Sequence, residues 1–306
     1  MTIEVAATVV GARSRLSPRL AGALPLATVL LIIGALWYLA AIGLNAPRVR
    51  DQLDLSGQSW TAGDLIKGTW AMERPVLPTP DQILVEFWKT TVGTSLTSKR
   101  NLLYHAWITA SATLLGFLFG VILGVALAVC IIHLRTLDRS LMPWIIVSQT
   151  IPILAIAPMI ILVLNALGLP QLLAKSAISA YLSFFPITIG MVKGLRAPDT
   201  PQLDLMRTYN ASDRQLLQKL RWPSSMPFLF ASLKVSVAIS LVGAIVGELP
   251  TGAVAGLGAR MLIGSYYGQT IQIWSALLMA SLLGVAMVLT IAAFERATNR
   301  RMGVRS

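Results

Sequence analysis

The chain has 306 residues, of which 55% are hydrophobic and only 12% are charged, and its formal net charge is +12. A soluble globular domain carries about 25% charged residues, so this composition excludes a chain whose surface faces mainly water. The basic residues lie in short loops between apolar runs, a distribution that favours a membrane protein over a nucleic-acid-binding one. The only cysteine, Cys130, excludes an internal disulfide and is expected to pack as a small apolar side chain.

The first apolar run covers residues 24–44 and follows an N-terminal tail, residues 1–23, that holds Arg13, Arg15 and Arg19. About 20 apolar residues are needed for a helix to cross a bilayer core of about 30 Å. A signal peptide is the alternative, but its apolar region is usually about 7–15 residues long. We therefore expect a retained membrane-spanning helix.

The segment 45–105 is the least membrane-like part of the chain, with seven basic and six acidic residues. Within it, Asp81–Lys89 is amphipathic, because Ile83, Leu84, Phe87 and Trp88 fall on one side of a helix. A short interfacial helix is one interpretation, and a small docking surface for a partner is the other.

Five more apolar runs follow, near residues 113–134, 142–167, 172–192, 227–249 and 271–294. The predicted fold is thus all-α, a polytopic membrane bundle of about six helices over residues 24–294, with a tail at 295–306. Lone prolines such as Pro152, Pro158 and Pro186 are tolerated in such a bundle, where neighbouring helices re-satisfy the freed carbonyls.

The loop charges predict the orientation. Residues 1–23, 135–139, 193–221 and the tail after Phe294 carry net charges of +2, +1, +3 and +3, whereas the intervening segment 45–105 carries +1. Positive loops stay on the cytoplasmic side. Both termini are therefore expected in the cytoplasm, segment 45–105 is expected outside, and the chain is expected in a bacterial inner membrane.

The cytoplasmic loop 196–223 has local signals for two short helices. Thr200 followed by Pro201 suits a helix start, and Asn210 suits a stop because asparagine enters the left-handed region cheaply. Ser212 and Gln215 form a capping box that opens a second helix, which Pro223 is expected to end. Leu216, Leu217 and Leu220 form the apolar face of that helix.

Such a helical knob suits docking in a groove of a partner, although two surface helices that merely cap the bundle would show the same pattern. The layout resembles the loop that couples ATP-binding-cassette (ABC) importer permeases to their ATPases. That loop reads Glu-Ala-Ala, three residues, Gly, nine residues, then Ile-x-Leu-Pro. The spacing places Asp204-Leu205-Met206 at the triplet, Asn210 at the glycine and Leu220-Arg221-Trp222-Pro223 at the end, with the residue types changed at most of these positions.

Other segments resemble the nitrate, sulfonate and taurine group of these permeases. They are Leu77-Pro-Thr-Pro-Asp81, Gln149-Thr-Ile-Pro152, Ala157-Pro158, Phe184-Phe-Pro186 and the glycine-rich stretch from Gly252 to Ala259. Together they run in the order of the family from about Leu24 to Phe294.

The resemblance implies a type I importer, in which this chain is the membrane-spanning permease subunit. The implied partners are an ABC ATPase dimer that binds ATP and Mg, a second permease subunit, identical or paralogous, and an extracytoplasmic solute-binding protein. The sequence contains no phosphate-binding loop, so this chain is expected to bind no cofactor and to catalyse nothing itself. The residues expected to couple to the ATPase are Asp204, Arg207, Asn210, Ala211, Arg214, Leu217, Leu220 and Pro223.

Candidates for the translocation path are Gln149, Thr150, Phe184, Phe185 and Glu248. Ser148, Gln149 and Thr150 could line a path or hydrogen-bond a neighbouring helix. Lys234 and Glu248 are charges inside the fifth span, which marks a functional site unless their side chains snorkel to the membrane surface. Gly252, Gly256 and Gly258 suit an outer gate or a flexible loop. His105 and His133 are too far apart in sequence to suggest a shared metal.

Two other classes of membrane protein compete with this interpretation. A secondary transporter usually shows inverted repeats and broken helices, and no convincing repeat is visible. An intramembrane enzyme needs paired catalytic groups within the spans, and such groups are scarce here.

Overall fold

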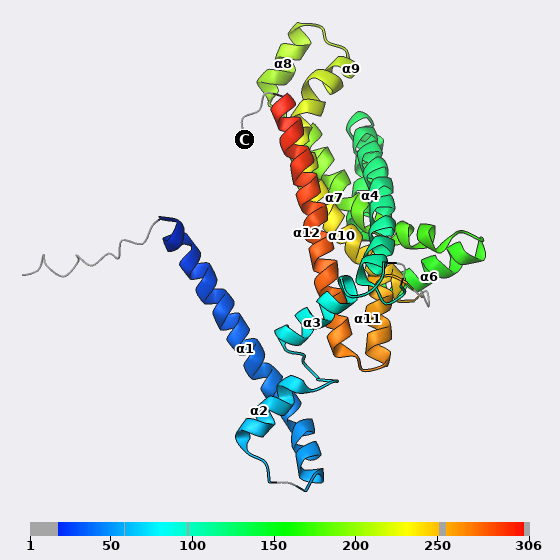
Figure 1. Ribbon diagram of the computed structural model, residues 1–306. Coiled ribbons are helices and arrows are strands. Elements are labelled where there is room, and N and C mark those ends of the chain that lie inside the picture. The colour runs from blue at the N-terminus through cyan, green and yellow to red at the C-terminus, as the bar shows by residue number, and fades with distance from the viewer. Residues whose placement is uncertain (1–17, 58, 97, 251–254, 303–306) are drawn as a thin grey trace, which may run out of the picture. The chain divides into compact units, whose positions relative to one another are not determined.

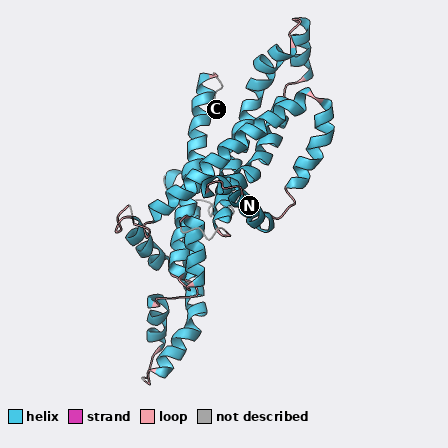
Figure 2. Cartoon of the chain, turned by 90° about the vertical axis from the view of Figure 1, so that its right-hand side faces the viewer, coloured by secondary structure: helices cyan, strands magenta, loops and turns pink. Residues whose placement is uncertain are grey.

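The computed structural model describes residues 18–57, 59–96, 98–250 and 255–302. The expectations for the N-terminal residues 1–17, for Gly252 and for Arg305 fall outside these ranges. The described secondary structure consists of helices joined by short loops (Figure 2). The chain divides into two units, Met1–Gln82 and Ile83–Ser306, which are described separately.

The first unit contains α1 (Pro18–Leu55), α2 (Ala62–Ala71) and the start of α3 (Pro80–Thr91). Helix α1 continues beyond its apolar run to Leu55 and includes Pro47, so neither the change in polarity nor this proline ends it. The fully buried Asn45 of α1 holds the loop between α2 and α3 by hydrogen bonds. Its Nδ2 donates to Leu77 O (2.9 Å), and its Oδ1 accepts from the N–H of Val76 (2.7 Å). Trp37 Nε1 also donates to Pro78 O (3.0 Å), so the Leu77–Asp81 segment is fixed to α1.

The second unit is a helix bundle. Its elements after α3 are α4 (Leu102–His133), α5 (Arg135–Ser148), α6 (Ile153–Ala166), α7 (Gln171–Leu195), α8 (Thr200–Thr208), α9 (Asp213–Leu216), the π-helix η1 (Leu217–Arg221), α10 (Trp222–Glu248), α11 (Leu257–Tyr266) and α12 (Thr270–Arg301). Helices α8 and α9 lie beyond one end of the bundle, beside the C-terminal end of α12, and α11 lies at the opposite end (Figure 1).

Five helices of the described chain are long and apolar enough to cross a membrane, or six if the bent pair α5–α6 counts as one span. That pair lies where the third span, near 142–167, is predicted, and its two helices are bent by 102°, so this region is not one continuous helix. The cause is Pro152, which has no N–H and restricts the residue before it. Helix α5 ends in a tight turn in which the N–H of Thr150 donates to Val147 O (2.9 Å). Pro158 and Pro186 lie inside α6 and α7, as expected.

Small residues bring α4, α7 and α10 into close contact. An added Cβ at Gly116 of α4 would lie 2.4 Å from Ser176 O of α7, a backbone atom that cannot rotate away, so only glycine fits there. Ser179 Oγ of α7 donates to Ser240 O of α10 (2.9 Å), and Ser240 Oγ donates to Thr113 O of α4 (3.1 Å). Glycine and serine are the residues that let membrane helices approach closely and bond to one another.

One boundary and one side chain differ from expectation. Helix α4 begins at Leu102, with Asn101 Oδ1 accepting from the N–H of Leu103 (2.7 Å), so residues 102–105 belong to a span rather than to the outer segment. Cys130 lies on the exposed face of α4, because its neighbours Ala128 and Ile131 occupy the packed face. The amphipathic stretch 81–89 does form a helix, α3, with Ile83 buried and Trp88 exposed.

Candidate coupling loop and buried polar cluster

The predicted elbow is present at Asn210. This residue has φ 48°, which makes it the one non-glycine residue with positive φ in the described chain. The N–H groups of Asn210 and Ala211 donate to Arg207 O (2.8 Å) and Met206 O (3.0 Å), so the last carbonyls of α8 are satisfied as the chain turns. The helix start shifts by one residue, because Asp199 and not Thr200 is the N-cap, and Asp199 N–H donates to Gln202 Oε1 (3.2 Å).

The second helix of the loop starts as predicted but does not end at Pro223. Ser212 and Gln215 form the capping box, with Ser212 N–H donating to Gln215 Oε1 (2.9 Å). The chain then passes through η1 into α10 without interruption. Trp222 N–H donates to Leu217 O, five residues back, and this wider turn accommodates a proline that lacks an N–H. The loop is therefore joined to the fifth span by one continuous helix.

The side chains of the loop are largely exposed and not packed into the bundle. No residue of α8 or α9 is buried, and Tyr209 at the elbow is 77% exposed. Arg207 Nη1 lies 3.0 Å from Asp204 Oδ1 along α8. Of the other predicted coupling residues, Arg214 and Pro223 are exposed and Ala211, Leu217 and Leu220 are half-buried. Leu217 packs against the apolar core that α4, α7 and α10 share.

The predicted path residues fall into two places. Gln149 and Thr150 are exposed at the break between α5 and α6, and not inside a continuous span. Phe184 and Phe185 are half-buried on α7 and contact the apolar core. Tyr181 joins the two regions, because its hydroxyl donates to Ser148 O (2.6 Å).

Glu248 lies in a different setting, at the end of α10. Its carboxylate is fully buried, which contradicts the snorkelling alternative. Thr109 Oγ1 donates to Oε1 (2.9 Å), Gly258 N–H donates to Oε2 (2.7 Å), and Lys175 Nζ lies 3.7 Å from Oε1. Lys234 is different again: it is partly exposed and forms an ion pair with Glu295 of α12.

The N-terminus of α11 is fixed by the same cluster. Gly256 N–H donates to His105 Nδ1 (3.0 Å), and Leu257 N–H donates to Thr109 Oγ1 (2.9 Å). The first amides of a helix have no partner within it, so these bonds satisfy groups that would otherwise be orphaned. Gly256 has φ 133°, and a Cβ there would lie 2.2 Å from the carboxylate of Glu248. Gly256 and Gly258 are thus packed residues and not part of a flexible loop.

The sequence did not predict three members of this cluster, namely Lys175, Thr109 and His105. The available signal was Lys175, an isolated cation beside an otherwise uncharged run, which could have been matched with the acidic Glu248. Threonine and histidine carry no comparable signal in a helix. Within the described residues no group of three or more His, Cys, Asp or Glu side chains could hold a metal ion. The cluster joins α4, α7, α10 and α11 by ionic and hydrogen bonds.

Comparison with known proteins identifies the chain. Residues 116–304, more than half of the sequence, match the family described as "Binding-protein-dependent transport system inner membrane component". The chain belongs to this family. It is therefore a membrane-spanning permease subunit of an ABC importer, which confirms the predicted function and sets aside the secondary transporter and the intramembrane enzyme.

Several relatives support the assignment. The permease is 32% identical over 189 residues to a "Probable ABC transporter permease protein" of Haemophilus influenzae, covering 61% of this chain and 74% of the relative. It is 31% identical over 237 residues to the "Riboflavin transport system permease protein RibX" of Chloroflexus aurantiacus, covering 78% and 83%. It is 29% identical over 212 residues to the "Formylaminopyrimidine transport permease protein ThiX" of Halalkalibacterium halodurans, covering 69% and 79%.

The fold agrees with a solved transporter. A chain of the inward-facing MetNI methionine ABC transporter superposes with a TM-score of 0.54 at 19% identity, covering 64% of this permease and 95% of that chain. At this identity the likeness shows the fold alone, and it confirms the all-α membrane bundle.

Proposed function

We propose that the loop 196–223 of this permease docks on an ABC ATPase dimer, and that ATP and Mg are bound by that partner. The observation that carries the proposal is the exposed elbow at Asn210. The elbow lies between two capped helices. The side chains of Asp204, Arg207 and Arg214 on these helices are exposed. A compact helical projection of this kind suits a groove in a partner.

The continuous helix from Asp213 to Glu248 provides the route by which docking acts on the bundle. A displacement of the elbow is passed through η1 to α10, because no loop intervenes to absorb it. Helix α10 is held to α7 by the Ser179–Ser240 bond and ends at the buried Glu248. Movement of the ATPase would therefore reach α11 at the other end of the bundle, as expected for gating by packed helices.

The remaining partners complete an importer. A second permease subunit would complete the path, and an extracytoplasmic binding protein would deliver the solute. Gln149, Thr150, Phe184 and Phe185 are proposed to line the path beside the α5–α6 break. Glu248, whose carboxylate is already engaged, would shape the outer end of the path through α11. The basic loops support a cytoplasmic membrane location with both termini inside.

The test is to co-purify the permease with its ATPase and compare Asn210→Val with Asn210→Gly. Valine is β-branched and adopts positive φ at a cost of about 1–2 kcal/mol, whereas glycine adopts it freely. We expect the valine variant to lose most of the bound ATPase and of the stimulated ATP hydrolysis, and the glycine variant to retain both. Undiminished attachment and stimulation in Asn210→Val, and in a variant lacking residues 200–223, would refute the proposal.

A further inference from the structure

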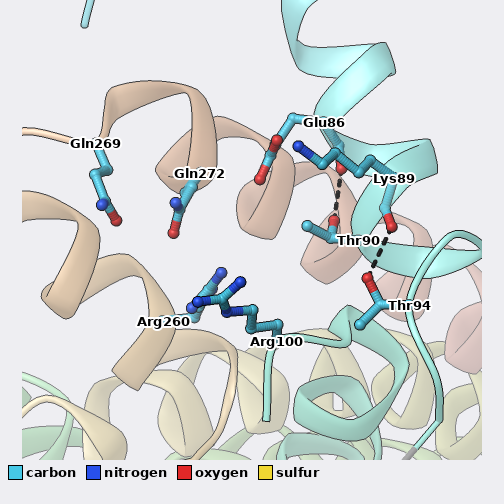
Figure 3. A pocket seen from close by; sticks show the side chains of 8 residues that line it. All are labelled: Glu86, Lys89, Thr90, Thr94, Arg100, Arg260, Gln269 and Gln272. Atoms are coloured by element: carbon cyan, nitrogen blue, oxygen red, sulfur yellow. Dashed lines mark hydrogen bonds between the residues drawn. The ribbon is translucent and has the colours of Figure 1, made fainter. Parts of the chain in front are cut away.

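A polar cavity of about 510 Å³ lies in the second unit, between α3, the residues before α4, α11 and the start of α12 (Figure 3). The side chains that line it are Glu86, Lys89, Thr90, Thr94, Arg100, Arg260, Gln269 and Gln272. This volume falls within the range of small-molecule sites, about 300–1,000 Å³. The family assignment gives the cavity no role, and it does not include the buried cluster around Glu248.

Two arginines dominate the cavity. Arg100 and Arg260 lie side by side and extend into the same space, with Gln269 and Gln272 across from them (Figure 3). In the described part of the chain, neither guanidinium has a carboxylate within ion-pairing distance. Burial lowers the pKa of Arg260, the Glu86 carboxylate raises it and Arg100 lowers it again. Two like charges thus share one cavity, in which Glu86 is the single acidic lining residue.

The two threonines contribute little to binding, and the charged donors of the cavity are Lys89 and the two arginines. Thr90 Oγ1 donates to Glu86 O (2.6 Å) and Thr94 Oγ1 donates to Lys89 O (2.9 Å), so both hydroxyl protons are already used. Three lining residues are basic and one is acidic. The field in the cavity therefore favours an anion, and planar guanidinium groups match the oxygens of carboxylates, sulfonates and phosphates in bidentate geometry.

We propose that this cavity binds a small soluble oxyanion, with its charged group between Arg100 and Arg260 and the rest of the molecule against Gln269 and Gln272. The cavity is at the end of the bundle opposite α8 and α9. Its opening on the extracytoplasmic side rests on the proposed function, whereas the binding itself does not.

The test uses the full chain with its ATPase in phosphatidylcholine nanodiscs. The probe is trifluoromethanesulfonate, observed by 19F NMR line broadening, with neutral trifluoroethanol and empty nanodiscs as references. We expect broadening of the sulfonate alone, and only with the protein. Because a hydrogen bond to a charged group is at stake, Arg100→Gln and Arg260→Gln should each weaken the apparent affinity about tenfold or more.

The matched control is Lys99→Gln, which removes the same charge next to Arg100 without lining the cavity, and it should bind the probe as the wild type does. Arg100 is exposed, so its variant should fold even if the half-buried Arg260 proves necessary for folding. Co-elution with the ATPase reports on folding separately, which distinguishes failure here from failure of the proposed function. The proposal is overturned if the wild type gives no broadening, if trifluoroethanol broadens equally, or if Arg100→Gln binds as tightly as Lys99→Gln.

Discussion

Lys175 of α7 and Glu248 of α10 form an ion pair in which the two side chains are only 4% and 0% exposed. Lys175 Nζ also donates to Ala255 O (3.3 Å), just before α11. The desolvation of two such charges can offset their attraction, so the pair need not add net stability. Removing only one of the two charges is strongly destabilising, because the other charge then remains buried without a partner.

Removing one partner of this pair should therefore destabilise the permease more than removing both. We expect Lys175→Met and Glu248→Gln each to cost about 3–5 kcal/mol, and the double variant to recover much of the loss. Thermal unfolding in detergent, followed by loss of the monodisperse species, measures the differences. Equal and additive losses in the singles and the double would contradict the role of the ion pair.

A control for charge removal is available at the other end of the bundle. Arg196 and Asp138 lie 2.8 Å apart, but both side chains are substantially exposed. Asp138→Asn should cost about 0–1 kcal/mol in the same assay. A loss as large as that of Glu248→Gln would indicate that the assay does not resolve burial.

The contact between α4 and α7 gives a second prediction. Gly116→Ala places a methyl group 2.4 Å from Ser176 O and 2.4 Å from Ser179 Cβ, and because neither atom moves with a rotamer change, the helices must separate. Overpacking of this kind costs about 1–3 kcal/mol. The comparison is Gly34→Ala in α1, where no atom lies within 4 Å of the added carbon and stability should not fall. Thermal stability of the two variants, measured side by side, decides the matter.

A third prediction compares Gly256 with Gly168, because both have positive φ but only Gly256 is closely packed. Gly256→Ala combines φ 133° with a clash against the carboxylate of Glu248. Gly168→Ala has positive φ (75°) but open space around it. We expect a modest loss of stability at Gly168, about 1 kcal/mol, and a clearly larger one at Gly256. Equal losses would mean that the clash is relieved at no cost.

The helical link through η1 predicts an uncoupled variant. Lys219→Pro introduces a proline into the π-helical turn, four residues before Pro223, which should break the helix at a cost of about 3 kcal/mol, whereas Lys219→Ala should be harmless. The elbow itself would remain, so the ATPase should still co-purify. We expect its stimulation by the permease to fall severalfold, measured as ATP hydrolysis in nanodiscs. Full stimulation in Lys219→Pro would show that coupling does not need a continuous helix.

The spans and the elbow were predictable because their signals are local. Uncharged apolar runs mark helices of membrane length, and the Ser212–Gln215 pair and Asn210 specify backbone conformations by their own chemistry. The break in the third span was not predictable, because Pro152 carries the same local signal as Pro158 and Pro186, which lie inside helices. The difference lies in which carbonyls the neighbouring helices can satisfy, and a single sequence does not show that.

The buried cluster was not predictable for a related reason. Glu248 and Lys175 are far apart in the sequence, and Thr109 is an ordinary polar residue in an apolar helix until α10 is placed beside it. Pro223 illustrates the reverse error. Proline commonly ends a helix, but here the π-helical turn before Pro223 lets the helix continue into α10.

The glycine and serine contacts between α4, α7 and α10 have a consequence for how the permease can move. Long, flexible side chains at an interface would let neighbouring helices slide by changing rotamers, but Gly116 and the backbone of Ser176 that it meets have no rotamer to change. The three helices should therefore turn together as a single block. Any opening of the path must then come from hinges outside that block, and the 102° bend between α5 and α6 is one such place.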